Sequence, residues 1–262
     1  MSNQPIGFFD SGVGGTSIWK EVHQLLPFEH TIYLADSKNA PYGEKSKETI
    51  LSYSIKNTEF LLNKGCKLIV VACNTATTNA IKELRSMFDV PFIGIEPAIK
   101  PAALNSKTNA IGILATKGTL SSELFTRTSE KFASHITVVE QVGEGLVELI
   151  ESGKLNSTET KKLLKKYIGT MLALKTDYIV LGCTHYPYLI PQIKEIVGPE
   201  VTIIDSGNAV ALQTKNILSQ YSMLNSDKTK SRHHFFTNGT IDVLSTILEP
   251  LTPEMLIKYE DF

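Results

Sequence analysis

The sequence has few of the features that would assign it to a membrane, a secreted disulfide framework or a zinc protein. It contains only 3 cysteines in 262 residues, none at a Cys-x-x-Cys spacing, and no apolar run approaches the length that crosses a bilayer. We therefore expect free thiols, no metal site and no membrane association. The N-terminus lacks a basic stretch followed by an apolar run, so we expect a cytoplasmic protein.

An excess of charge of either sign is also missing. The 26 Lys and Arg residues stand against 27 Asp and Glu residues, for a net charge of -1. This balance offers no broad electrostatic surface to nucleic acid or to an anionic membrane, so the expected partner is a small molecule or another protein. The 42% of hydrophobic residues suffices for the core of one large domain or two smaller ones.

Short β-branched runs recur along the chain, each followed by a turn and a segment of helical periodicity. They lie at residues 5–9, 30–34, 67–71, 91–95, 110–114, 136–139, 177–181 and 201–204. This alternation is typical of a parallel sheet with helical connections, and the last four runs repeat the order and spacing of the first four. The sequence predicts an α/β fold of two pseudo-symmetric domains. Each would be a mostly parallel sheet of four or more strands flanked by helices, with the active site in the interdomain cleft.

The segment after Ser206 has no counterpart in this repeat. It contains a predicted helix at 210–218 and a predicted strand at 232–237, which we expect to pack onto the first half. The predicted domains are therefore 1–95 plus 206–262, which is discontinuous, and 96–205.

Two cysteines occupy equivalent positions of the repeat, Cys73 in Val70-Val-Ala-Cys-Asn-Thr75 and Cys183 in Val180-Leu-Gly-Cys-Thr184. Ligands bind at the carboxyl ends of strands in open parallel sheets, which is where both are predicted to lie. A buried cysteine usually acts as a small hydrophobe, but polar neighbours in both copies favour chemistry. Cys66 lacks such neighbours and is assigned no role. Two thiols on opposite faces of a carbon suit stereoinversion, in which one removes a proton and the other supplies one.

Each thiol needs a neighbour that can exchange a proton with it, because an ordinary thiol is mostly protonated at neutral pH. Asp10, at the end of the first predicted strand, and His185 are candidates. An Asp before glycines is equally typical of a cap, and a His is often only a buried polar group, so both interpretations stay open. Charge developing on a substrate carboxylate could be stabilised by helix N-termini and by the side chains of Ser11, Asn74, Thr75 and Thr184.

Two loops and a glycine-rich turn complete the candidate residues. Ala40-Pro-Tyr-Gly43, and Thr116 with Thr119, follow predicted strands and would border the cleft, although turn geometry also explains them. Gly12-Val-Gly-Gly-Thr-Ser17 precedes a predicted helix and has Asp36 further on, as a dinucleotide fingerprint would. A serine replaces the third glycine of that fingerprint, so we do not expect dinucleotide binding.

Four motifs together resemble the glutamate racemases of the aspartate/glutamate racemase superfamily. They are Phe9-Asp-Ser-Gly-Val-Gly-Gly15, Ala40-Pro-Tyr-Gly43, Ala72-Cys-Asn-Thr-Ala76 and Gly182-Cys-Thr-His-Tyr-Pro187, and their order and spacing agree over almost the whole chain. The resemblance implies a cofactor-independent isomerase that interconverts L- and D-glutamate and supplies D-glutamate for peptidoglycan, acting as a homodimer. Some members carry an N-terminal extension associated with activation by a cell-wall precursor. The first predicted strand starts near residue 5, so we do not expect that regulation here.

The resemblance also implies residue roles. Cys73 and Cys183 are the paired acid and base, Asp10 assists Cys73, and His185 with Glu151 assists Cys183. Glu151 comes from the resemblance alone, since nothing in the spacing separates it from Glu148. The implied substrate pocket is lined by Ser11, Pro41, Tyr42, Gly43, Asn74, Thr75, Thr116, Thr119 and Thr184.

Three alternatives stay open at this point. An aspartate racemase would share the fold and the cysteine pair and differ in the distance to the second carboxylate. A two-lobed amino-acid-binding module would close on its ligand without changing it. A one-cysteine decarboxylase or hydrolase would leave the second cysteine idle.

Overall fold

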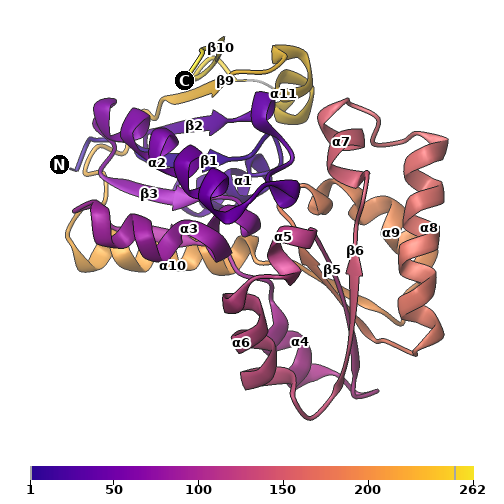
Figure 1. The fold of residues 1–262 in the computed structure, drawn as a ribbon. Helices are drawn as coiled ribbons and strands as arrows, with labels where there is room; N and C mark the ends of the chain where they lie inside the picture. The colour runs from indigo at the N-terminus through magenta and orange to yellow at the C-terminus, as the bar shows by residue number, and fades with distance from the viewer. Residues whose placement is uncertain (1, 251) are drawn as a thin grey trace.

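The computed structural model describes residues 2–250 and 252–262 and contains two parallel sheets, each flanked by helices (Figure 1). The first sheet has the strand order β10-β9-β2-β1-β3-β4 and the second β6-β5-β7-β8. The strands of the first sheet are β1 (Ile6–Asp10), β2 (Thr31–Ala35), β3 (Leu68–Val71), β4 (Phe92–Gly94), β9 (His233–Thr237) and β10 (Met255–Tyr259). Those of the second are β5 (Ala110–Ala115), β6 (Thr137–Val142), β7 (Tyr178–Gly182) and β8 (Thr202–Ile204).

The internal repeat predicted from the sequence is present in the topology. The order β2-β1-β3-β4 in one sheet corresponds to β6-β5-β7-β8 in the other, and every one of these pairs is parallel. All eight predicted strands are present within one residue of their expected bounds, except that β6 ends three residues later than expected, so the predicted α/β fold is confirmed. Strands β3 and β7, which precede the two cysteines, occupy equivalent places.

Helices connect these strands and cover the faces of both sheets (Figure 1). The α-helices are α1 (Thr16–Leu25), α2 (Lys47–Asn63), α3 (Asn74–Met87), α4 (Ile99–Asn105), α5 (Lys117–Leu120), α6 (Glu123–Ala133), α7 (Leu146–Glu151), α8 (Thr158–Ala173), α9 (Ile190–Val197), α10 (Gly207–Gln220) and α11 (Ile241–Leu248). Three 3-10 turns are η1 (Ser37–Asn39), η2 (Tyr42–Glu44) and η3 (Tyr186–Leu189).

Local sequence accounts for how the central strands and their helices form. All five residues of β1 are buried, because the strand is covered on both faces: Phe8 packs with the α1 side of the core and Phe9 with the α2 and α3 side. Cys73 is the N-cap of α3, and its Sγ accepts a hydrogen bond from the Ala76 amide at 3.4 Å. Thr116 caps α5 in the same manner through the Thr119 amide. The site cysteine is therefore held at the start of a helix.

The segment after Ser206 extends the first sheet. Strand β9 pairs in parallel with β2, and α10 packs against α1 on one face of that sheet. The structure adds α11 and β10, which the sequence did not predict, with β10 at the outer edge beside β9 (Figure 1). Within the described residues, no helix is both long and apolar enough to cross a membrane.

Candidate active site

Cys73 and Cys183 line one small buried cavity between the carboxyl ends of the two sheets. Each lies within two residues of the end of its strand and is almost inaccessible to solvent, and both are free thiols. The cavity, which we call the inner cavity, has a volume of about 10 Å³, room for about one water molecule. It is lined by Ser11, Pro41, Tyr42, Gly43, Cys73, Asn74, Thr75, Thr116, Val147, Cys183, Thr184 and His185.

A larger outer cavity of about 670 Å³ adjoins the inner one. The two share Pro41 and Gly43 from the loop after β2, Thr116 from the loop after β5, and Val147 from α7. Both cavities are thus walled by segments that follow both sheets.

Cys73 is surrounded by Ser11 and Asp10, which end the neighbouring strand. The Ser11 hydroxyl lies 3.7 Å from Cys73 Sγ, and Asp10 Oδ2 accepts a hydrogen bond from the Gly15 amide at 2.8 Å. Burial raises the pKa of Asp10, against the opposing effect of His185 and the Gly15 amide. Burial, reinforced by the Asp10 carboxylate, also raises the pKa of Cys73 well above that of an ordinary thiol. The environment of Cys73 therefore favours the protonated thiol.

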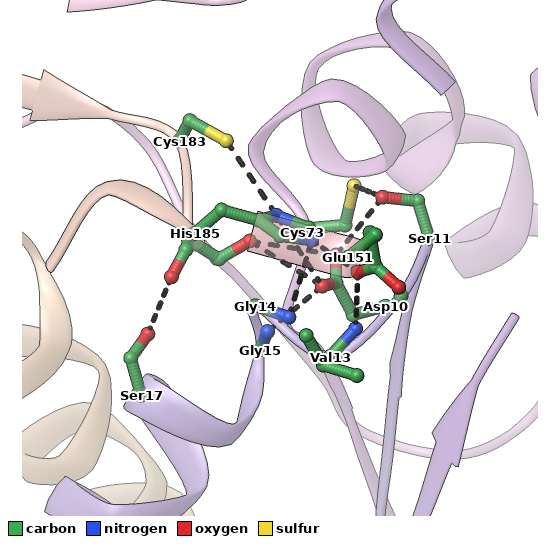
Figure 2. A network of polar contacts seen from close by, with 12 residues as sticks. Asp10, Ser11, Val13, Gly14, Gly15, Ser17, Cys73, Glu151, Cys183 and His185 are labelled. Carbon is green, nitrogen blue, oxygen red and sulfur yellow. Dashed lines mark hydrogen bonds and ion pairs between the residues drawn. The ribbon is translucent and has the colours of Figure 1, made fainter. Parts of the chain in front are cut away.

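Cys183 faces a different neighbour, the imidazole of His185. Nδ1 of His185 lies 3.7 Å from Cys183 Sγ and 4.0 Å from Asp10 Oδ2, while Nε2 lies 2.6 Å from Glu151 Oε1 (Figure 2). The carboxylate can only accept, so the short contact with Glu151 places a proton on Nε2, and the Gly14 amide, 3.3 Å from the same nitrogen, then finds no acceptor there. Burial acts to lower the pKa of His185, but contacts with Cys183, Glu151 and Asp10 outweigh it and raise the pKa well above its ordinary value. The two cysteines thus stand in opposite electrostatic environments.

The glycine-rich turn after β1 is occupied by protein side chains. The Val13 amide donates to Glu151 Oε1 at 2.6 Å (Figure 2), and a Cβ added at Gly12 would lie 1.9 Å from that same oxygen. A Cβ added at Gly14 would lie 2.2 Å from His185 Nδ1. The glycines therefore make room for Glu151 and His185, and the Val13 and Gly15 amides already donate to Glu151 and Asp10, which removes the space and two of the donors that a dinucleotide pyrophosphate would need.

Three threonine hydroxyl groups form contacts between α3 and the segment after β5, beside the inner cavity. Thr75 Oγ1, on α3, lies 2.8 Å from Thr116 Oγ1 and 3.4 Å from Thr119 Oγ1. Thr119 is fully buried behind this pair and does not line the inner cavity. Asn74, by contrast, lines it with both amide atoms buried and without a hydrogen-bond partner. A buried amide with a free donor and acceptor is suited to a polar ligand.

Most residues implied by the sequence are brought together here. All five proposed catalytic residues form one contact network, and eight of the nine proposed pocket residues line the inner cavity, the exception being Thr119. The segment after Cys183 continues into the 3-10 turn η3, which has Pro187 in its first turn and the side chain of Tyr186 buried. Val147, which lines the inner cavity, and Ser37, which donates a hydrogen bond to Glu151, were not predicted from the sequence. Ser37 lies two residues beyond the end of β2, and no local sequence pattern marks its contact with Glu151.

Comparisons with known proteins agree with this geometry. A family model described as Asp/Glu/Hydantoin racemase matches residues 7–214. That match spans most of the chain and includes both cysteines, so the chain belongs to this family of racemases.

Within the family, the chain is similar to several glutamate racemases. It is 46% identical to the glutamate racemase of Herpetosiphon aurantiacus over 91% of this chain and 94% of that protein. Its fold matches the crystal structure of glutamate racemase isoform RacE1 from Bacillus anthracis with a TM-score of 0.87, at 30% identity, covering 100% and 98% of the two chains. It matches Escherichia coli glutamate racemase in complex with L-glutamate and activator UDP-MurNAc-ala with a TM-score of 0.86, at 32% identity and 97% of each chain. The chain is accordingly an amino-acid racemase, an isomerase.

Proposed function

We propose that the chain interconverts L- and D-glutamate without a cofactor, using Cys73 and Cys183 as acid and base on opposite faces of the substrate's alpha carbon. One observation carries the proposal: one cysteine from each sheet, at topologically equivalent strand ends, lines the same buried cavity. Two thiols across one carbon have a use in stereoinversion, which needs an acid and a base at once. The glutamate bound by the E. coli neighbour supports glutamate as the substrate.

The electrostatics support an assignment of the resting protons. Cys73, buried beside the Asp10 carboxyl group, holds its proton, whereas Cys183 faces an imidazole whose raised pKa favours the cation. A neighbouring imidazolium stabilises a thiolate. We propose that Cys183 is the thiolate and Cys73 the thiol at rest. The enzyme would then first bind the enantiomer that presents its alpha proton to Cys183, and each turnover would reverse the two protonation states.

Stabilisation of the carbanion is assigned to the residues around the cavity. The alpha proton is far less acidic than a thiol, so the charge that spreads onto the carboxylate needs donors already in place. Asn74, with its unpartnered amide, and the hydroxyls of Ser11, Thr75 and Thr184 supply them. The described residues lining the inner cavity include no lysine, which a pyridoxal Schiff base would require. The side chains present therefore fit direct proton transfer.

The wider setting is proposed from the family. We propose two domains, 1–95 with 206–262 and 96–205, in a cytoplasmic homodimer that supplies D-glutamate for peptidoglycan. The separate sheets and the pairing of β9 with β2 support the division.

The deciding experiment is racemisation of L-glutamate and L-aspartate by the purified chain without added cofactor, followed by circular dichroism. Loss of the glutamate signal with incorporation of solvent deuterium at the alpha carbon is the expected result. Turnover of aspartate alone would show that the substrate is aspartate and not glutamate. Binding of glutamate without any deuterium incorporation would instead identify a two-lobed binding module.

A further inference from the structure

Ser37 makes a contact across the two halves that the proposed chemistry does not yet explain. It begins η1 directly after Asp36, and its Oγ donates to Glu151 Oε2 at 2.8 Å. The other oxygen of the same carboxylate accepts from the Val13 amide and from His185. A single carboxylate from α7 therefore binds the glycine-rich turn, the imidazole and the loop after β2.

That loop, residues 36–44, forms a wall of the inner cavity and is braced internally. The buried Asp36 carboxylate accepts hydrogen bonds from the Tyr42 hydroxyl, from Asn39 at 2.8 Å and from Asn238 at 2.6 Å. A Cβ at Gly239 would lie 2.7 Å from Ser37 Cβ, so this glycine leaves room for the serine. These contacts make the loop a braced unit with Ser37 at its start. Its contact with Glu151 therefore constrains the cavity wall.

The small size of the inner cavity suggests what the hydrogen bond between Ser37 and Glu151 does. A volume of about 10 Å³ holds about one water molecule, so its walls must separate before an amino acid can enter. Ser37 and Glu151 do not line the cavity themselves, but they belong to two segments that do: the loop after β2, through Tyr42 and Gly43, and α7, through Val147. Their hydrogen bond is suited to breaking on opening and forming again on closure.

We propose that Ser37 is a positioning residue that closes the site: its hydroxyl, bonded to Glu151 Oε2, holds the loop bearing Tyr42 and Gly43 over bound substrate. The inference rests on the proposed function, because it assigns to Glu151 a second task beside its contact with His185. A contact that stabilises the closed complex contributes to substrate affinity first, and to turnover only when closure becomes incomplete.

Ser37→Ala tests this directly. We expect its KM for both enantiomers to rise about tenfold with kcat changed less than about twofold, because one hydrogen bond to a charged acceptor is lost from the closed state. The dissociation constant of D-glutamate, measured by calorimetry without turnover, should rise by the same factor. Ser37→Thr, which keeps the hydroxyl, should restore KM to within about threefold of wild type.

Ser106→Ala is the matched control. Ser106 Oγ donates to Asp177 Oδ1 at 2.7 Å, a serine–carboxylate contact of similar length near the amino ends of β5 and β7, away from the cavity. It should leave KM unchanged. In a Glu151→Ala background, Ser37→Ala should have less than about a twofold further effect, because the acceptor is gone.

Two results would overturn the proposed role of Ser37. The first is a KM and a dissociation constant of Ser37→Ala that equal those of wild type. The second is a tenfold rise in KM on Ser37→Ala that persists in the Glu151→Ala background. Neither result would contradict the proposed racemisation, which is tested by the activity of the wild-type enzyme and of the cysteine variants. Conversely, an inactive wild type would still let calorimetry decide the role of Ser37.

Discussion

Glu151 Oε1 lies 2.6 Å from His185 Nε2, and this contact directs the opposite ring nitrogen toward Cys183. The ion pair is almost buried and joins two elements on the second-sheet side, α7 and the segment after β7. Its environment orients the imidazole and favours its charged form. The contact thereby links a residue that never reaches the inner cavity to a thiol that lines it.

Glu151→Gln should therefore change the pH dependence as well as the rate. The hydrogen bond to Glu151 is one of the causes that raise the pKa of His185, and a neutral amide accepts such a bond more weakly, so Glu151→Gln lowers that pKa. If the active form carries an imidazolium beside Cys183, activity is lost as pH rises through the His185 pKa. The alkaline limb of kcat/KM should move to lower pH in Glu151→Gln, and kcat/KM should fall about ten- to a hundredfold. An alkaline limb unchanged from wild type would contradict this role of Glu151.

Replacement of either cysteine should abolish most of the activity, by the same factor in both reaction directions. Cys73→Ser and Cys183→Ser should each lower kcat/KM by about a thousandfold or more, since a hydroxyl is a much weaker acid than a thiol and each general acid–base contribution is of order 10²–10⁴. Because the two enantiomers have equal free energies, kcat/KM must fall by the same factor in both directions. D-glutamate binding should persist in both variants. Cys66→Ser, at a buried thiol whose pKa burial raises to about 12, is the control that should keep its activity.

The sequence predicted the strands because each is a short buried run followed by a turn, and the repeat made their order readable. It did not predict β10, a mostly exposed edge strand whose residues carry no clear alternation. Cys73 and Cys183 stood out because they are paired in the repeat. Glu151 could not be separated from Glu148 by spacing. In the structure Glu151 contacts His185 whereas Glu148 lines the outer cavity, a difference set by the packing of α7.

The role of Ser37 could not be predicted from local sequence either. Its partner is 114 residues away, so no local pattern marks the contact. The glycine-rich turn was similarly ambiguous, because the sequence shows that side chains are absent from it but not which groups fill the space. Contacts between distant segments decide both cases.

Gly14→Ala should inactivate the protein through His185. The added methyl group would lie 2.2 Å from Nδ1, so the imidazole must leave its place beside Cys183. We expect kcat/KM to fall more than about a hundredfold, the scale of a misplaced catalytic group. Gly169→Ala in α8 is the control, since its Cβ meets nothing within 4 Å. That variant should keep full activity and gain about 0.5–1 kcal/mol of stability, because alanine favours a helix over glycine. Near-normal activity of Gly14→Ala would show that the imidazole does not need its present position.

His233 should make the fold sensitive to acid. Burial, followed by the positive charges of nearby histidines, lowers the pKa of His233 to about 3 from an ordinary 6.5. The unfolded chain therefore binds a proton that the folded chain excludes between these two values, and the stability contributed by neutral His233 is lost as pH falls from about 6.5 toward 3. The ring is held by hydrogen bonds to Thr31 and Ser231 and packs edge-on against Trp19. The free energy of unfolding is measured by urea denaturation at a series of pH values. In this pH window its slope against pH should be smaller in His233→Gln than in wild type, by an amount that corresponds to up to one bound proton. An identical slope in wild type and variant would mean that His233 keeps an ordinary pKa in the folded protein.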